Sequence, residues 1–266
     1  MISSVLRSES VFLIKNIKIY QPAFIFTKNA EITFIRNSES VTLPPYTIAF
    51  LEKGLDFSMR VLRKGNGLPY ESVIIDNSLL TPVYHLFELT THNGMKLPTQ
   101  GNRILQKRLF VIDDTEHDED LLDFMKNNRD DHTLLSSRLA SILSKVPDRD
   151  GVFISMGISL AKNFCDKIRE IVEDQLERKW KVSDLADIFY CSEVAIRKKL
   201  EKENTNFNQL MHDIRMKKAA KMILNTDCNV SRVASAIGIS STSYFIKQFK
   251  KFYGVTPKKY YLNLRQ

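Results

Sequence analysis

The chain has 266 residues, longer than one typical domain, and its 43% of hydrophobic residues is enough to fill two cores. Its apolar runs are far shorter than the roughly 20 residues of a membrane helix, and no secretory signal is present, so we expect a cytoplasmic protein with no membrane partner. The net charge of +8 lies in the C-terminal part: residues 1–160 contain 18 Lys and Arg against 19 Asp and Glu, and residues 161–266 contain 21 against 12. Such a one-sided positive field suits a polyanion, and nucleic acid is the first candidate.

The first third of the chain has the pattern of an all-β domain. Short β-prone segments with turn signals between them occupy residues 11–20, 23–28, 31–36, 46–54, 57–62 and 72–76. Short strands at this spacing are typical of an antiparallel sandwich or a small barrel. We therefore expect a β-rich N-terminal domain.

After residue 76 the spacing of apolar residues becomes helical. The predicted helices lie near residues 78–90, 102–110, 118–128, 132–145 and 152–178. The clearest linker signal is the segment 147–151, PDRDG, which lies close to the change in charge. The sequence therefore predicts an α+β protein with an N-terminal sensing or dimerisation domain at residues 1–158 and an all-α domain at 159–266.

One helical stripe in this region has two interpretations. It consists of Leu134, Leu135, Arg138, Leu139, Ile142 and Leu143. A stripe of this width fits the core of the domain and the interface of a homodimer equally well.

The C-terminal domain contains an internal repeat. A shift of 48 residues places Leu185-Ala186 on Val233-Ala234 and Ser192 on Ser240, and one added residue makes the shift 49 in the helix that follows. Each copy reads as a short helix, a tight turn and a second helix, which is the pattern of a helix-turn-helix. The predicted elements are a first helix-turn-helix at about residues 182–203, a linker helix at about 208–225 and a second helix-turn-helix at about 230–252.

The second helix of each copy buries one face and presents a cationic, hydrogen-bonding face, as a reader of the major groove must. The residues predicted to contact bases are Val194, Arg197 and Lys198 in the first copy and Thr242, Ser243, Ile246 and Lys247 in the second. Arg forks onto guanine, and Val and Thr meet the thymine methyl group. The residues predicted to bind phosphates are Arg232, Lys250, Lys258 and Lys259. Double-stranded DNA is the predicted partner, although a helix-turn-helix can also be a packing unit alone.

The aromatic residues of the second copy have a separate predicted role. They are expected to pack inward, behind the reading face: Tyr244, Phe245, Phe249, Phe252 and Tyr260.

The same region resembles a known family. The likeness is carried by Trp180, Leu185-Ala186, Ser192, Leu200, Phe207, Arg215 and Ala219, followed by Val233-Ala234, Ile237-Gly238, Ser243-Tyr244-Phe245, Phe249-Lys250 and Tyr253-Gly254-Val255-Thr256-Pro257. Over residues 163–264 the chain looks like the AraC-type transcription regulator domain. The resemblance implies two helix-turn-helix units joined by one helix, which holds two recognition helices for successive major grooves, about 34 Å apart.

A narrower likeness lies in the segments ENTNFNQ and ISSTSYFI, which are similar to the Rns-, ToxT- and RegA-like virulence activators of enteric bacteria. This likeness implies an activator of virulence or colonisation genes that contacts RNA polymerase. Where the family usually has Gly, the chain has Asn204-Thr205-Asn206. Because Asn tolerates the left-handed conformation, we expect the turn to be kept.

The front half resembles a cupin-like sensing and dimerisation domain, which implies a small anionic effector, bicarbonate or a fatty acid. Lys15, Lys18 and Lys28 are the candidate carboxylate ligands, facing a cavity among Phe24, Phe26, Ile48 and Phe50. The plainer interpretation, which we prefer, is that they are surface lysines of amphipathic strands. Tyr20 and Ile74 stand where a fatty-acid-binding relative has basic residues, which argues against that ligand.

We expect no enzyme activity, no metal and no cofactor beyond such an effector. The five histidines show no HxH spacing, and the three cysteines show no CxxC spacing. Two alternatives to a DNA-binding activator remain: a regulator that acts mainly by protein contact, for instance as an antagonist heterodimer, and a ligand-binding cupin with an accessory domain.

Overall fold

The computed structural model describes residues 11–90, 103–112, 123–125, 127–128, 130–225 and 229–265. The chain passes from one compact unit to a second between Ala161 and Lys162, three residues after the boundary expected from the sequence. Each unit is treated by itself below. The predicted helix at 118–128 lies mostly outside the described residues.

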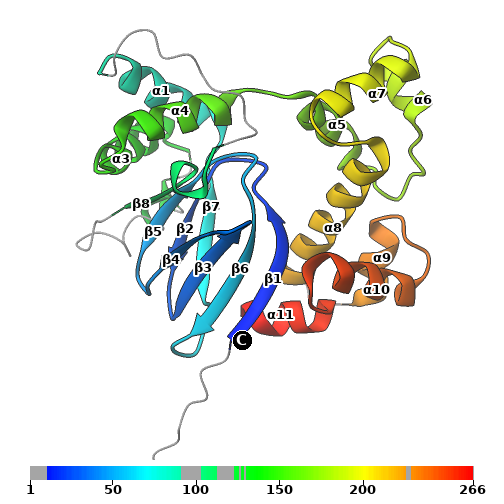
Figure 1. Ribbon diagram of the computed structural model, residues 1–266, viewed down its shortest axis with the longest axis horizontal. Coiled ribbons are helices and arrows are strands. Elements are labelled where there is room, and N and C mark those ends of the chain that lie inside the picture. Colours follow the sequence, from blue (N-terminus) through cyan, green and yellow to red (C-terminus); the bar gives the residue numbers. More distant parts are fainter. Residues whose placement is uncertain are drawn as a thin grey trace, which may run out of the picture. The chain divides into compact units, whose positions relative to one another are not determined.

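Two four-stranded antiparallel sheets form the framework of the first unit (Figure 1). Their orders are β1-β6-β3-β4 and β7-β2-β5-β8. The strands are β1 Val11–Lys18, β2 Ala23–Thr27, β3 Ala30–Arg36, β4 Glu39–Leu43, β5 Ile48–Leu51, β6 Asp56–Arg63, β7 Tyr70–Ile74 and β8 Leu109–Ile112. This arrangement confirms the β-rich N-terminal domain.

The burial pattern of each strand follows from its place in the sheets. β6 alternates between buried and more exposed residues, as a strand with one covered face does. In contrast, every residue of β2, AFIFT, is buried, so both faces of the second sheet are covered. The hairpin between β3 and β4 turns over Asn37, whose φ of 54° is a conformation that Asn tolerates.

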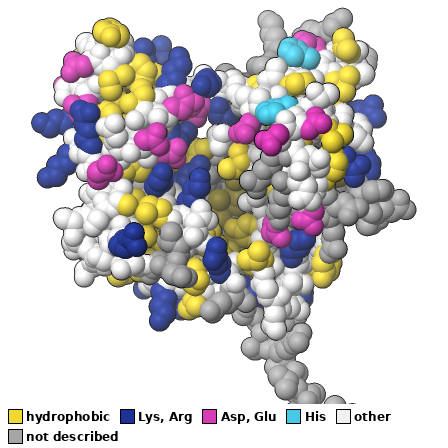
Figure 2. All heavy atoms as spheres, turned by 180° about the vertical axis from the view of Figure 1, so that it is seen from behind, with side chains coloured by type: hydrophobic (Ala, Val, Ile, Leu, Met, Phe, Trp, Pro, Cys, Tyr) yellow, Lys and Arg dark blue, Asp and Glu magenta, His cyan; other side chains and the backbone are white. Residues whose placement is uncertain are grey.

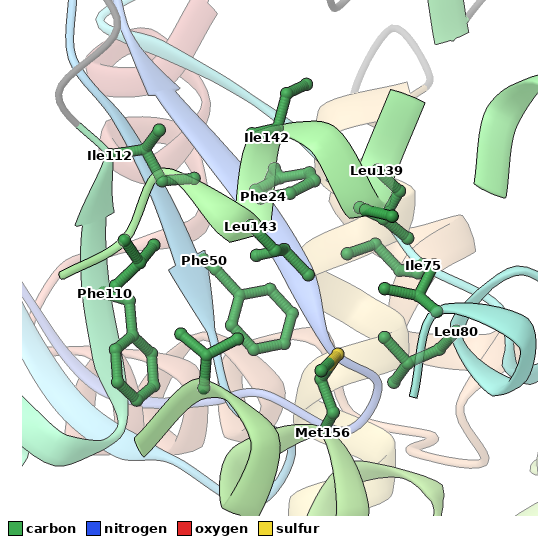
Figure 3. Packing of buried hydrophobic residues seen from close by; sticks show 14 of the residues in the cluster. Phe24, Phe50, Ile75, Leu80, Phe110, Ile112, Leu139, Ile142, Leu143 and Met156 are labelled. Atoms are coloured by element: carbon green, nitrogen blue, oxygen red, sulfur yellow. The ribbon is translucent and has the colours of Figure 1, made fainter. Parts of the chain in front are cut away.

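Helices cover one face of the second sheet. They are α1 Asn77–Glu88, α3 His132–Ser144 and α4 Arg149–Leu160, and a short 3-10 helix, η1 Leu105–Lys107, precedes β8. Their apolar side chains share one buried cluster with Phe24, Phe26, Ile48 and Phe50 of the sheet, and Figure 3 shows Phe24 and Phe50 within it. Those four residues therefore fill the core between sheet and helices.

The helical stripe of α3 belongs to this core. Leu135, Leu139, Ile142 and Leu143 are buried within it, and only Leu134 of the stripe's leucines is substantially exposed. Figure 3 shows Leu139, Ile142 and Leu143 in this core. Of the two interpretations of the stripe, packing inside the domain is confirmed.

Buried polar groups tie the end of β5 to α4. The carboxylate of Glu52, which is fully buried, accepts hydrogen bonds from Nε of Arg108 at 2.8 Å and from Oγ of Ser155 at 2.7 Å. The ammonium group of Lys53 donates to the carbonyl oxygen of Ala161 at 2.6 Å. These bonds fix the last residue of the first unit to its own sheet.

Three local predictions were wrong. Residues 102–110 were expected to be helical, but they contain η1 and the start of β8. β4 was not predicted at all. The segment PDRDG, read as a linker, is the start of α4, where the side chain of Asp148 caps the helix by accepting a hydrogen bond from the N–H group of Gly151 at 3.0 Å.

The second unit consists of helices in the part of the chain that the structure describes (Figure 1). They are α5 Phe164–Val172, α6 Val182–Ile188, α7 Glu193–Lys202, α8 Phe207–Asn225, α9 Val230–Ala236, α10 Thr242–Tyr253 and α11 Pro257–Arg265. The single predicted helix at 152–178 is thus two helices, α4 and α5. Asn163 starts α5 with a reciprocal capping box to Asp166.

Candidate nucleic-acid interface

The first helix-turn-helix consists of α6, a tight turn and α7. The hydroxyl group of Ser192 caps α7 by accepting a hydrogen bond from the N–H group of Ala195 at 3.2 Å. Ile196 and Leu200 are fully buried against α5, α6 and the start of α8. The predicted base-contacting residues of this copy, Val194, Arg197 and Lys198, all lie on the exposed side of α7.

The charges of the first helix-turn-helix are largely balanced within α7. The guanidinium group of Arg197 pairs with the carboxylate of Glu193 at 3.1 Å. Lys199 lies with its ammonium group 5.0 Å from the centre of the Phe164 ring. The carboxylate of Glu203 accepts hydrogen bonds from backbone N–H groups at the start of α5. The positive electrostatic field at α7 is therefore weak, and the guanidinium group of Arg197 is already held by Glu193 in the absence of DNA.

The second helix-turn-helix consists of α9, a tight turn and α10. Its recognition helix rests on an aromatic core of four buried rings, whose centroids are 4.7 to 5.7 Å apart: Phe245, Phe249, Tyr253 and Tyr260. On the outward side of α10, Ser243 and Lys247 are exposed, whereas Thr242 and Ile246 are half-buried. The expected division of this helix into an aromatic inner face and a cationic outer face is therefore present.

One aromatic residue does not follow that expectation. Tyr244 is 55% exposed and lies on the outer face of α10, beside Lys247 one turn later. The prediction that it packs inward was wrong, because Tyr244 lies outside the apolar stripe that Phe245, Phe249 and Tyr253 form at intervals of four residues. Its helical spacing from Lys247 was the signal that identifies it as part of the outer face.

The predicted phosphate-binding residues are also exposed. Arg232 lies in the first turn of α9, Lys250 on α10, and Lys258 and Lys259 in the first turn of α11. Residues 228–266 contain no carboxylate to offset them. In Figure 2, Lys and Arg side chains on the lower left have no Asp or Glu among them, whereas both kinds are intermixed on the upper left. Within the helical domain, the second helix-turn-helix and α11 therefore carry most of the uncompensated positive charge.

The two turns have the same backbone geometry. The N–H groups of Cys191 and Ile239 donate to the carbonyl oxygens of Ala186 and Ala234, at 3.0 and 2.9 Å. The capping residue of α10, however, is Ser241, so Ser192 corresponds to Ser241 and not to Ser240 as the sequence repeat suggested. The added residue of the second copy therefore lies in its turn.

α8 joins the two helix-turn-helix units. Leu210, Met211 and Ile214 in its first half belong to the core of the first helix-turn-helix. In the same half of the helix, His212 contacts the ring of Phe252 on α10 at 5.4 Å between centroids, and burial lowers the pKa of this histidine. Burial lowers the pKa of Lys217 from 10.5 to about 7, helped by nearby Arg169 and opposed by Glu173.

Within the helical domain, the turn of the second helix-turn-helix lies against the backbone of Leu176. Gly238, in the second turn, has a φ of 74°, and a Cβ atom built there would lie 2.5 Å from the carbonyl oxygen of Leu176, which precedes the first unit. Asn204, before α8, has a φ of 55°, so the predicted left-handed turn is confirmed. The turn before α8 and the turn of the second helix-turn-helix therefore both use a residue that accepts positive φ.

The candidate effector residues are not brought together. Lys15 and Lys18 are exposed on β1, and the ammonium group of Lys18 lies 5.7 Å from the ring centre of Tyr20. Lys28 is half-buried just after β2. The four apolar residues of the predicted cavity pack in the core between the second sheet and the helices, whereas Lys15 and Lys18 lie on a strand of the first sheet.

Neither a metal site nor a membrane helix is evident in the described part of the chain. Among those residues, no three His, Cys, Asp or Glu side chains form a group that can hold a metal ion. Over the same ranges, none of the helices has the length and apolar character required to cross a bilayer.

Comparison with known proteins agrees with this geometry. A family model described as a helix-turn-helix domain matches residues 185–262. The HTH-type transcriptional activator FapR of Escherichia coli is 37% identical over 253 residues, which cover 95% of this chain and 97% of FapR. The virulence regulon transcriptional activator VirF of Shigella flexneri is 32% identical over 246 residues, 92% of this chain and 93% of VirF.

Solved structures show the same fold. ToxT from Vibrio cholerae matches with a TM-score of 0.69 and 19% identity, over 96% of this chain and 95% of ToxT. A second ToxT structure, with an unsaturated fatty acid bound, matches with a TM-score of 0.63 and 17% identity, over 96% of this chain and 92% of that one. The long match to FapR and VirF decides the family: the chain belongs to the AraC-type transcription regulators, whose helix-turn-helix domain binds DNA.

Proposed function

We propose that this regulator is a sequence-specific activator that binds promoter DNA by inserting α7 and α10 into two successive major grooves. The observation that carries the proposal is the division of both helices into two faces. Ile196 and Leu200 on α7, and Phe245 and Phe249 on α10, are fully buried, while basic side chains occupy the opposite faces. A helix with one face fixed and one face free is the part that enters the groove.

The length of α8 fits this mode of binding. A helix of 19 residues is about 28 Å long, comparable with the roughly 34 Å of one turn of B-DNA. The cores at either end of α8 hold one recognition helix each. The expected binding site is therefore bipartite, with two blocks of sequence about one helical turn apart.

The two recognition helices have different roles in this proposal. α7 carries Glu193 beside Arg197, so its unscreened charge is small, and its binding depends on specific base contacts. α10 and α11 present Lys247, Lys250, Lys258 and Lys259 in a segment, residues 228–266, that contains no Asp or Glu, so they supply the salt-dependent attraction to the backbone.

A salt titration tests the DNA-binding part. Fragments captured from the genome by the purified protein are compared with random duplex, using the wild type and Lys247→Ala. The wild type is expected to prefer captured fragments at every salt concentration, and Lys247→Ala to weaken binding to both DNAs. Retention of DNA at low salt only, with no preference for any fragment, would instead favour a regulator that acts by protein contact.

The regulated genes and the partner are part of the same proposal. The proposed regulator acts as a homodimer in the cytoplasm and activates virulence or colonisation genes by contacting RNA polymerase. The name of VirF, a virulence regulon activator, supports the assignment of these genes. In-vitro transcription from captured promoters is the test. Increased transcript from purified polymerase supports activation, whereas occupied promoters with unchanged transcript contradict it.

A small anionic effector, bicarbonate or a fatty acid, is the proposed signal. Support comes from the fold likeness to ToxT, one structure of which holds an unsaturated fatty acid. Lys15, Lys18 and Lys28 remain the proposed carboxylate ligands, of which Lys15 and Lys18 are exposed on β1 and Lys28 is half-buried after β2. DNA affinity measured with each compound tests the idea: a shift with one of them supports it, and unchanged affinity with both overturns it.

A further inference from the structure

Tyr190, in the turn of the first helix-turn-helix, combines an uncommon backbone with an almost fully solvated side chain. Its φ is 50°, in the left-handed region, and its relative exposure is 96%. Bulky residues pay for this conformation because their Cβ atom crowds the backbone. The equivalent position of the second helix-turn-helix is Gly238, and glycine has no such penalty.

The other left-handed residues of the described chain show how such a cost is normally met. Asn16, Asn37 and Asn204 are of the type that tolerates positive φ. Tyr46, with a φ of 60°, donates a hydrogen bond from its hydroxyl group to Asn29 at 3.2 Å. The side chain of Tyr190 makes no hydrogen bond or ring contact within the described residues. Its conformation is therefore not offset inside the chain, and strain of this kind points to a role outside it.

The place of Tyr190 in the motif indicates what that role is. It lies two residues before Ser192, the cap of α7. When the first residues of a recognition helix enter the major groove, the residues just before its cap lie at the edge of that groove, along the sugar-phosphate backbone. Tyrosine hydroxyl groups are among the regular donors to DNA phosphates.

The weak field of α7 makes such a neutral contact useful. Arg197 is paired with Glu193, and Val194, in the first turn of α7, is apolar and exposed. A phenolic hydroxyl group adds a phosphate hydrogen bond without requiring a further positive charge. It also fixes the register of the helix on the duplex, which a helix that depends on base contacts requires.

We propose that Tyr190 is a DNA-positioning residue, whose hydroxyl group donates a hydrogen bond to a backbone phosphate at the edge of the groove that α7 enters. The inference rests on the proposed DNA-binding function. It predicts that the residue contributes to affinity for any duplex, without reading its sequence.

Two variants separate the hydroxyl group from the backbone. Tyr190→Phe removes only the donor, and we expect affinity for a captured fragment and for random duplex to fall by the same factor, about threefold to tenfold. The salt dependence of binding stays unchanged because no charge is lost. Tyr190→Gly is expected to lose at least as much affinity while its melting temperature rises. Tyr46→Phe, in the strained turn of the first unit, is the control and keeps wild-type affinity.

The outcomes are distinct. Wild-type affinity in Tyr190→Phe for both DNAs would overturn the proposal, and so would a loss confined to the captured fragment, which would indicate base reading. Lost activation with intact affinity would also overturn it, in favour of a contact with polymerase. If the wild type itself does not prefer captured fragments over random duplex, the proposed function fails, whatever the result for Tyr190.

Discussion

Tyr190 and Gly238 occupy the same position in the two helix-turn-helix units. Their φ angles are 50° and 74°, and their N–H groups donate to the carbonyl oxygens of Asp187 and Ser235, three residues earlier, at 3.3 and 2.9 Å. The same backbone turn thus contains a large aromatic residue in the first helix-turn-helix and glycine in the second. The reasons differ, since Tyr190 faces solvent and Gly238 lies against the backbone of Leu176.

This difference predicts opposite effects on stability. Tyr190→Gly relieves backbone strain and is expected to raise the free energy of unfolding by about 0.5 to 1 kcal/mol, the strain being partly offset by the greater freedom of glycine in the unfolded chain. Gly238→Ala adds a Cβ atom where the φ is unfavourable and the Leu176 oxygen is too close, so a loss of about 1 to 3 kcal/mol is expected. Urea denaturation of both variants measures this, and equal effects of one sign would contradict the explanation.

A second prediction concerns the buried carboxylate of Glu52. Glu52→Gln leaves the guanidinium group of Arg108 in the core without its counter-ion, and the side chains of the pair are 0% and 2% exposed. We expect a loss of about 3 to 5 kcal/mol. Asp56→Asn is the matched control, because it breaks the Arg36–Asp56 pair, whose carboxylate is 60% exposed, at a cost below about 1 kcal/mol. Equal melting temperatures for the two variants would refute the difference in role.

The ammonium group of Lys217 predicts a pH dependence of stability. Its pKa is about 7 in the folded protein and 10.5 ordinarily, so between these values the unfolded chain binds more protons than the folded one. The free energy of unfolding therefore rises with pH across this window, and the cost of burying the charged form is present in full below it. Urea midpoints at about pH 6 and about pH 9.5 test this against Lys217→Met. The urea midpoint of the wild type should rise relative to that of Lys217→Met as the pH increases. An equal change of midpoint in both proteins would exclude Lys217 as the titrating group.

The architecture was largely predictable from the sequence because its signals are local. The 48-residue repeat located both helix-turn-helix units, and buried pairs such as Phe245 and Phe249 follow directly from helical spacing. Strand β8, LFVI, was not predicted correctly because a short apolar run fits a strand and a helix equally. β4 is an edge strand with a polar outer face, so it lacks the apolar signal of a central strand.

The details of the site were less accessible. The positive φ of Tyr190 was visible only through its alignment with Gly238, since nothing in its own neighbourhood marks a left-handed turn. Likewise, the pairing of Arg197 with Glu193 requires two side-chain conformations that spacing permits but does not fix. Candidate ligands such as Lys15 failed to meet the aromatic residues because adjacent strands in the sequence belong to different sheets.

The Glu193–Arg197 pair leads to a fourth prediction. Glu193→Gln releases the guanidinium group and removes a negative charge from the face of α7, so affinity for DNA should rise between about twofold and fivefold, as expected for loss of an exposed ion pair. Glu170→Gln removes the same charge from α5, where Glu170 forms an exposed pair with Lys162, and should raise the affinity for DNA less. Fluorescence anisotropy on one duplex compares them, and a larger gain from Glu170→Gln would argue against the position assigned to α7.

The central claim, that α7 and α10 read separate grooves, is tested most directly by selecting binding sites from a random duplex library. The wild type is expected to select two blocks of sequence, about 10 to 11 base pairs apart from centre to centre. Arg197→Ala should lose base preference in one block and Lys247→Ala in the other, each at a cost of about 1 to 3 kcal/mol on the selected site. A single block, or wild-type sites selected by both variants, would contradict the account.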